Sequence, residues 1–186
     1  SGSHLISADD ICLSFPDSTE ALRGVSLQIA THEFVALVGP SGCGKSTLLR
    51  VLSGLQQPSS GTLSSTTSDI GFVFQDPTLL PWRSTLRNIE TLLELRGVNK
   101  NERRAKAQFA LESVGLQDSA QKYPRQLSGG MKMRASLART LVTDPSLLLL
   151  DEPFAAVDEF TRESLNDDLL TMFASAKFSA VFVTHS

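Results

Sequence analysis

Short apolar runs alternate with amphipathic stretches along most of this chain. Runs at residues 34–38, 70–74, 147–150 and 180–183 have the length and composition of buried strands. Between and after them the pattern predicts helices, over residues 47–52, 101–114 and 159–176. Because strands that alternate with helices build a largely parallel, helix-covered sheet, we assign the chain to the α/β class.

Two parts of the chain depart from this alternation. Near the N-terminus, residues 11–15 and 21–29 are predicted to form strands around a polar turn, which indicates an antiparallel β part. Residues 58–68 are rich in Pro, Ser, Gly and Thr and are expected to form a link. We therefore divide the chain into three parts. Residues 1–4 are a tag-like remnant, residues 5–75 and 144–186 form the core, and residues 76–143 form an inserted helical subdomain.

Composition and charge narrow the classes of protein to consider. The chain has 186 residues, with 17 Lys and Arg against 20 Asp and Glu. This slightly acidic balance disfavours a dedicated nucleic-acid surface, which carries a basic excess. No apolar run approaches the roughly 18 residues of a membrane span. The two cysteines, Cys12 and Cys43, are too few for a disulfide framework.

A glycine-rich loop follows the predicted strand at residues 34–38 and precedes the predicted helix. It matches G-x-x-x-x-G-K-[ST], the pattern of a phosphate-binding loop, in the strand–loop–helix setting that the motif needs. A glycine-rich turn that binds nothing is the alternative, and the flanking elements disfavour it. Inturned backbone N–H groups and the helix N-terminus would hold a triphosphate, while Lys45 reaches the β- and γ-phosphates and Ser46 ligates Mg²⁺. The expected ATP-binding residues here are Gly39, Pro40, Ser41, Gly42, Cys43, Gly44, Lys45, Ser46 and Thr47.

An acidic pair, Asp151 and Glu152, ends the leucine run at residues 147–150. A buried strand that ends in an acid places the carboxylate at the carboxyl edge of the sheet, where phosphate loops also lie. Asp151 is expected to hold Mg²⁺, and Glu152 to polarise the attacking water as a general base. Two solvated acids at a strand end are the alternative, but a phosphate loop needs an acidic metal partner.

Further motifs follow in a fixed order. Leu127-Ser128-Gly129-Gly130-Met131 lies between the phosphate loop and the acidic pair, Gln75 follows a predicted strand, Ala155-Ala156-Val157-Asp158 follows the acids, and His185 follows the last strand. Together they resemble the signature, Q-loop, D-loop and switch histidine of the ATP-binding-cassette (ABC) ATPases. The resemblance covers the chain from about residue 15 to its last residue.

The resemblance implies a role for each motif. Ser128, Gly129 and Gly130 would bind the γ-phosphate held by the opposite subunit of a head-to-tail dimer, formed with a second copy or a paired ABC subunit. Gln75 would contact Mg²⁺ and the attacking water, and His185 would orient that water; the catalytic set is then Lys45, Glu152 and His185. Phe15 would stack on adenine, although a core Phe fits the local sequence nearly as well.

One stretch points to a branch of the family. Residues 75–83, together with the sequences GPSGCGKSTLL and DEPF, resemble importer ATPases for nitrate, sulfonate and taurine. Leu79, Leu80 and Trp82 are expected to form a partly exposed contact for the membrane permease; packing of Trp82 in the core of the helical lobe is the alternative.

The resemblance thus implies an ATPase with ATP and Mg²⁺ as ligands, bound peripherally at the cytoplasmic face of the cell membrane. Its partners would be permease subunits and, indirectly, an extracellular or periplasmic solute-binding protein, with no nucleic acid. Family members continue beyond the switch histidine, so the C-terminal part of the core is expected to be missing here. Two other classes remain open: an ABC ATPase acting on nucleic acid or the ribosome, and a nucleotide sensor without turnover. Family members that act on DNA separate the phosphate loop from the signature by a long coiled coil, whereas 82 positions separate Lys45 from Leu127 here. Ribosome-acting members usually carry two cassettes in one chain, and the basic excess is missing. The presence of Glu152 and His185 speaks against a sensor without turnover.

Overall fold

The computed structural model describes residues 4–38, 44–154, 158–174 and 178–184, and these divide into two compact units. The first unit comprises residues 1–72, 146–152 and 177–186, and the second comprises residues 73–145 and 153–176. The second unit thus contains the expected helical lobe and also α5 (Glu159–Ala174), the helix that precedes the last strand of the chain.

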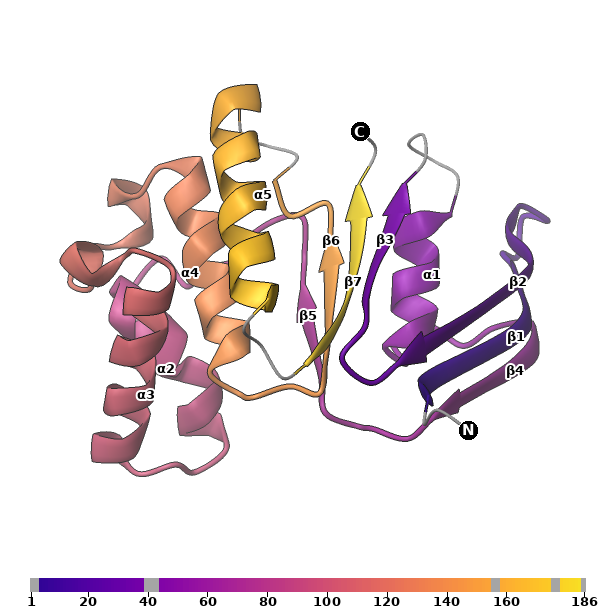
Figure 1. Ribbon diagram of the computed structural model, residues 1–186, viewed down its shortest axis with the longest axis horizontal. Helices are drawn as coiled ribbons and strands as arrows, with labels where there is room; N and C mark the ends of the chain where they lie inside the picture. The colour runs from indigo at the N-terminus through magenta and orange to yellow at the C-terminus, as the bar shows by residue number, and fades with distance from the viewer. Residues whose placement is uncertain (1–3, 39–43, 155–157, 175–177, 185–186) are drawn as a thin grey trace. The chain divides into compact units, whose positions relative to one another are not determined.

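A three-stranded antiparallel sheet, with strand order β2-β1-β4, opens the first unit (Figure 1). Its strands are β1 (His4–Ser14), β2 (Glu20–Ala30) and β4 (Ser60–Ser65). The antiparallel β part expected from the sequence is present, and β1 begins at His4, inside the segment that we set aside as tag-like. The expectation that residues 58–68 form only a link is wrong, because β4 pairs with β1 there.

The second sheet of this unit has four strands in the order β3-β7-β6-β5. They are β3 (Phe34–Val38), β5 (Ile70–Val73), β6 (Leu147–Asp151) and β7 (Ser179–Thr184). β7 runs parallel to both β3 and β6, as the apolar runs predicted. Every residue of β6 is buried, since a central strand of a parallel sheet is covered on both faces.

One helix, α1 (Lys45–Leu52), lies between the two sheets (Figure 1). Its buried residues share one hydrophobic cluster with β1, β2, β6 and β7. The cluster fixes the start of α1, and with it the end of the phosphate loop, relative to the central strands. Its fully buried members include Ile6, Ile11, Ile29, Leu49, Val51, Leu147 and Leu149.

The second unit is helical. α2 (Thr85–Leu95), α3 (Lys100–Ser113) and α4 (Gly129–Leu141) pack around their own hydrophobic cluster, and two single-turn 3₁₀ helices, at Gln117–Ser119 and Pro124–Gln126, connect α3 to α4. Ala135 and Ala138 of α4, and Val142 directly after it, are buried in this cluster. Side-chain caps begin all three helices, from Ser84, Asn99 and Ser128. No helix within the described residues is both long enough and apolar enough to cross a membrane.

Candidate functional site

The start of α1 is the described part of the phosphate loop. Gly44 is the N-cap of α1 with a φ of 91°, a left-handed conformation that favours glycine. A Cβ at this position would lie 2.5 Å from the backbone oxygen of Ala21, so the close approach of the loop to β2 also requires glycine. Because glycine has no side chain, Gly44 makes no side-chain cap at the start of α1. Gly39, Pro40, Ser41, Gly42 and Cys43 lie outside the described residues.

Ser46 and Asp151 meet although they are 105 positions apart in the chain. The Ser46 hydroxyl donates a hydrogen bond of 2.7 Å to Oδ1 of Asp151. Ser46 is in the first turn of α1, and Asp151 is the buried last residue of β6. The carboxyl edge of the parallel sheet therefore joins the two predicted magnesium ligands, as the strand-end position of Asp151 indicated.

The chemistry of this oxygen pair fits Mg²⁺. Mg²⁺ prefers oxygen ligands and commonly uses one or two protein groups beside water and phosphate. No cluster of three or more His, Cys, Asp or Glu side chains that could cage a metal occurs in the described part of the chain. A site built from the Ser46 hydroxyl and the Asp151 carboxylate would leave further coordination positions to water and phosphate oxygens.

Glu152 follows β6 and has a φ of 43°, which is uncommon for a residue with a side chain. Its backbone N–H donates a hydrogen bond of 3.0 Å to the carbonyl oxygen of Val183 on β7. This bond holds the turn after β6 against the neighbouring strand, so the position of Glu152 is set by two strands. Backbone strain of this kind concentrates at functional sites.

Of the other residues expected to contact the nucleotide, Lys45, Thr47, Phe15 and Gln75 are described by the structure. Lys45 and Thr47 lie in the first turn of α1 and are half-buried. Phe15 follows β1 and is 41% exposed, so it is not a core residue, and the stacking role remains a prediction. Gln75 is exposed two residues after β5 and belongs to the second unit. His185 lies outside the described residues.

The signature segment begins α4. The Ser128 hydroxyl accepts a hydrogen bond of 3.2 Å from the Met131 backbone N–H and so caps the helix. Gly129 and Gly130 are the first two residues of the helix, so the segment presents a helix N-terminus without bulky side chains. The expected contact of these three residues with a nucleotide on another subunit stays a prediction.

The segment from Pro77 to Arg83 contains the expected permease contact. Trp82 is 70% exposed, so the alternative that it fills the core of the helical lobe is wrong. Leu79 and Leu80 are half-buried, and Leu79 packs against the helical cluster. The exposed apolar part of the expected contact is therefore mainly Trp82.

Two residues that the sequence analysis missed hold this segment in place. The fully buried side chain of Asn88 accepts a hydrogen bond of 2.7 Å from the Leu80 N–H, and its Nδ2 lies 3.0–3.1 Å from the carbonyl oxygens of Leu80, Arg83 and Ser84. Arg139 of α4 donates to the carbonyl oxygens of Pro77 and Thr78. Burial lowers the pKa of the Arg139 guanidinium from its ordinary value. The sequence pattern does not predict these contacts of Asn88 and Arg139, because they depend on how residues 77–83 pack against α2 and α4.

Comparisons with known proteins give a family. The model of the ABC transporter family matches residues 22–155. An uncharacterised ABC transporter ATP-binding protein of Methanocaldococcus jannaschii is 45% identical over 174 residues, which cover 90% of this chain and 65% of that protein. The taurine import ATP-binding protein TauB of Yersinia pestis is 45% identical over 172 residues, covering 89% of this chain and 68% of that protein. The nitrate import ATP-binding protein NrtD of Synechocystis sp. is 42% identical over 175 residues, covering 90% and 66%. The chain thus spans about two thirds of the length of these relatives.

A solved structure supports the same assignment. CbiO1 of Clostridium perfringens, part of the ABC transporter complex CbiONQ, matches with a TM-score of 0.89 at 28% identity, over 98% of this chain and 79% of that one. The predicted fold class, an α/β ABC ATPase core, is confirmed by this match.

Proposed function

This chain belongs to the ABC transporter family, and from that premise we propose that it is the ATP-binding and ATP-hydrolysing subunit of an importer. It would act at the cytoplasmic face of the membrane, bound to permease subunits that receive solute from a solute-binding protein. The solute proposed is a small anion such as taurine, another sulfonate or nitrate, because relatives with 42–45% identity are named for taurine and nitrate import.

The hydrogen bond between Ser46 and Asp151 is the observation that carries the ATPase part of the proposal. It joins the helix that follows the phosphate loop to the acid that ends β6, and this is the pairing that holds Mg²⁺ in phosphate-loop enzymes. Mg²⁺ bound there would neutralise charge that develops on the phosphates. Ser46 and Asp151 would supply protein oxygens to the metal, and the N-terminus of α1 would face the phosphate oxygens with its partial positive charge.

Glu152 is the proposed general base. Glu152 follows Asp151 directly in the chain. Asp151 would bind the metal, and Glu152 would accept the proton of the attacking water. General-base assistance of this kind contributes about 10²–10⁴ in rate. Gln75 and His185 are the proposed water- and phosphate-contacting partners of Glu152.

The signature segment supports a dimeric site. Ser128, Gly129 and Gly130 begin α4, and Ser128 and Gly129 are exposed, so this N-terminus suits the binding of a phosphate oxygen. We propose that this end of α4 completes the nucleotide site of a second cassette, so that hydrolysis requires head-to-tail pairing.

Calorimetric titration with Mg-ATP and a steady-state ATPase assay, in the presence of the permease, test this function. Glu152→Gln should retain Mg-ATP binding and lose turnover by about 10²-fold or more, because only proton transfer is removed. Glu163→Gln, the same change at an exposed position of α5, should behave like wild type. Absence of Mg-ATP binding by folded protein would refute the proposal, and binding without wild-type turnover would identify a nucleotide sensor instead.

A further inference from the structure

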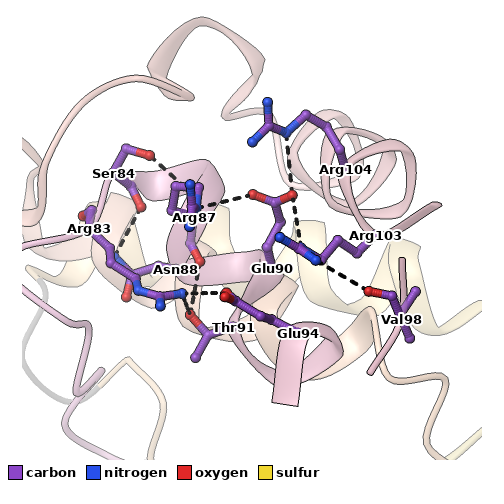
Figure 2. Close-up of polar contacts among 10 residues, drawn as sticks. All are labelled: Arg83, Ser84, Arg87, Asn88, Glu90, Thr91, Glu94, Val98, Arg103 and Arg104. Atoms are coloured by element: carbon purple, nitrogen blue, oxygen red, sulfur yellow. Dashed lines mark hydrogen bonds and ion pairs between the residues drawn. The ribbon is translucent and has the colours of Figure 1, made fainter. Parts of the chain in front are cut away.

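Glu90 on α2 is a fully buried carboxylate surrounded by arginines (Figure 2). The Nε atoms of Arg87, Arg103 and Arg104 lie 3.6, 3.7 and 3.3 Å from its oxygens. Arg87 approaches from α2 itself, and Arg103 and Arg104 approach from α3 on the other side (Figure 2). A buried carboxylate needs such partners, because an unpaired charge away from water is costly. One carboxylate, however, neutralises only one of the three arginines.

The surplus of positive charge extends to the neighbouring pair, Arg83 and Glu94, whose side chains are 2.9 Å apart. Four arginines thus face two glutamates in this part of the second unit. Arg103 is mostly buried, and its Nη1 donates to the Val98 carbonyl oxygen. The terminal nitrogens of Arg87 and Arg104 make no hydrogen bond to any described residue, and these side chains are 43% and 37% exposed.

Arg83, Arg87 and Arg104 line one hollow of about 420 Å³, together with Trp82, Gln121 and Tyr123. None of the residues that line this hollow is acidic. Glu90 accepts a hydrogen bond from Nε of Arg104 and forms an ion pair with Arg87 at 3.6 Å, where Nε of Arg87 has no hydrogen-bond partner. The outer guanidinium nitrogens of both arginines are therefore left to bind a group that enters the hollow. Guanidinium groups bind carboxylates through two parallel hydrogen bonds, so the hollow matches an acidic side chain in charge and in donor geometry.

We propose that the Arg83–Arg87–Arg104 hollow receives an acidic side chain of a partner protein, with Trp82 packing beside it. In the proposed function, on which this inference rests, that partner is the membrane permease. A protein partner fits better than a free ion for two reasons. The hollow is much larger than an inorganic anion, and the adjoining Trp82 is exposed where a partner could bury it.

Side chains of the helical unit also hold the backbone of the segment that presents Trp82. Asn88 and Arg139 bind its backbone at Leu80, Arg83, Pro77 and Thr78. A pre-organised surface loses little conformational entropy on association, which favours recognition of a protein segment. Glu90 contributes to this pre-organisation through its hydrogen bond with Nε of Arg104 and its ion pair with Arg87.

The test measures the affinity of the chain for the permease of its own transporter, in detergent and at two salt concentrations. Arg87→Gln and Arg104→Gln should each weaken the complex about tenfold or more and reduce its salt dependence, because each removes a charge-assisted contact. Lys106→Gln is the matched control. Lys106 lies on α3 like Arg104, pairs with Glu102 and does not line the hollow. Mg-ATP binding by the isolated chain should be unchanged in all variants.

A second variant guards against loss of folding. Glu90→Gln combined with Arg104→Gln removes one charge of each sign, so the remaining arginines keep the local charge balance while the hollow loses one donor group. This double variant should fold, as checked by thermal unfolding, and should still bind the permease about tenfold more weakly than Glu90→Gln alone.

The outcomes separate this inference from the proposed function. Permease affinities that are equal for wild type, Arg87→Gln and Arg104→Gln would overturn the inference and leave the importer assignment standing. Failure of wild type to bind the permease would overturn both. If inorganic sulfate or taurine stabilises the isolated chain, loses that effect in Arg104→Gln and leaves permease affinity unaffected by the same change, the hollow is a small-anion site and the inference is wrong.

Discussion

The Ser46 hydroxyl lies 2.7 Å from Oδ1 of Asp151, and this contact joins two elements that are separated by 105 positions of sequence. It is formed because β6 is a central strand whose carboxyl end lies at the same edge of the sheet as the start of α1. The contact gives the most direct test of the nucleotide site, since the metal-binding oxygen of each side chain can be removed or neutralised with little change in size.

Asp151→Asn should abolish Mg²⁺-dependent ATP turnover, by about two orders of magnitude or more, because a charged metal ligand worth several kcal/mol of charge stabilisation is replaced by a neutral one. Ser46→Ala should act in the same direction with a smaller loss. Turnover measured across a Mg²⁺ titration would show whether added metal restores activity. Unchanged Mg²⁺ dependence in both variants would remove this pair from the metal site.

Gly44→Ala tests the geometry of the loop end. The new Cβ would meet the Ala21 backbone oxygen at 2.5 Å, in addition to the cost of a φ of 91°. Gly54→Ala is a matched control, because Gly54 has a φ of 82° but nothing within 4 Å of the added Cβ. We expect Gly44→Ala alone to lose nucleotide binding in calorimetry, while both variants lose about 1–3 kcal/mol of stability from strain.

Asn88→Ala should destabilise the helical unit by about 1–3 kcal/mol for each buried backbone group left without a partner, the Leu80 N–H above all. Asn88→Asp should also lower the free energy of unfolding, although Asp and Asn have nearly the same size. A carboxylate oxygen would replace the amide nitrogen that faces the carbonyl oxygens of Leu80, Arg83 and Ser84. Urea unfolding measures both effects. Asn101→Ala, on the exposed face of α3, should stay close to wild type, and an equal loss there would contradict the role of Asn88.

Trp82→Ala should leave the free energy of unfolding within about 0.5 kcal/mol of wild type, because the side chain is exposed, yet it should weaken permease binding and transport. Phe109→Ala, at an equally exposed aromatic of α3, should preserve both properties. Thermal unfolding and a transport assay in vesicles distinguish the two. Normal transport by the Trp82 variant would remove this residue from the proposed contact.

Glu94 gives a prediction for pH. A hydrogen bond from Arg83 holds the pKa of Glu94 below its ordinary value. A carboxyl with a depressed folded-state pKa favours folding above its unfolded pKa, and that contribution is lost as the pH falls through the folded-state pKa. Arg83→Gln should therefore raise the pKa of Glu94 toward the ordinary value. Carboxyl chemical shifts followed by NMR between neutral and acidic pH would show the change, whereas an unshifted titration would exclude this cause.

The sequence predicted much of the first unit because its signals are local. Apolar runs such as residues 34–38 and 147–150 became β3 and β6, since a strand buried on both faces must be apolar throughout. The strand at Ser60–Ser65 was missed because it has no local hydrophobic pattern. It is a mostly exposed, polar strand at the edge of the sheet, where it pairs with β1.

The residue pattern alone is enough to assign the α/β class, the order of the nucleotide motifs and the presence of an acid at a strand end beside a phosphate loop, because each of these depends on short local stretches. The exposure of Trp82, the hydrogen bonds of Asn88 to the loop before it and the burial of Glu90 among three arginines are known only from the folded chain. These features arise when α2, α3 and the preceding loop pack together. Burial and charge pairing are then properties of that arrangement, and no spacing along the chain encodes them.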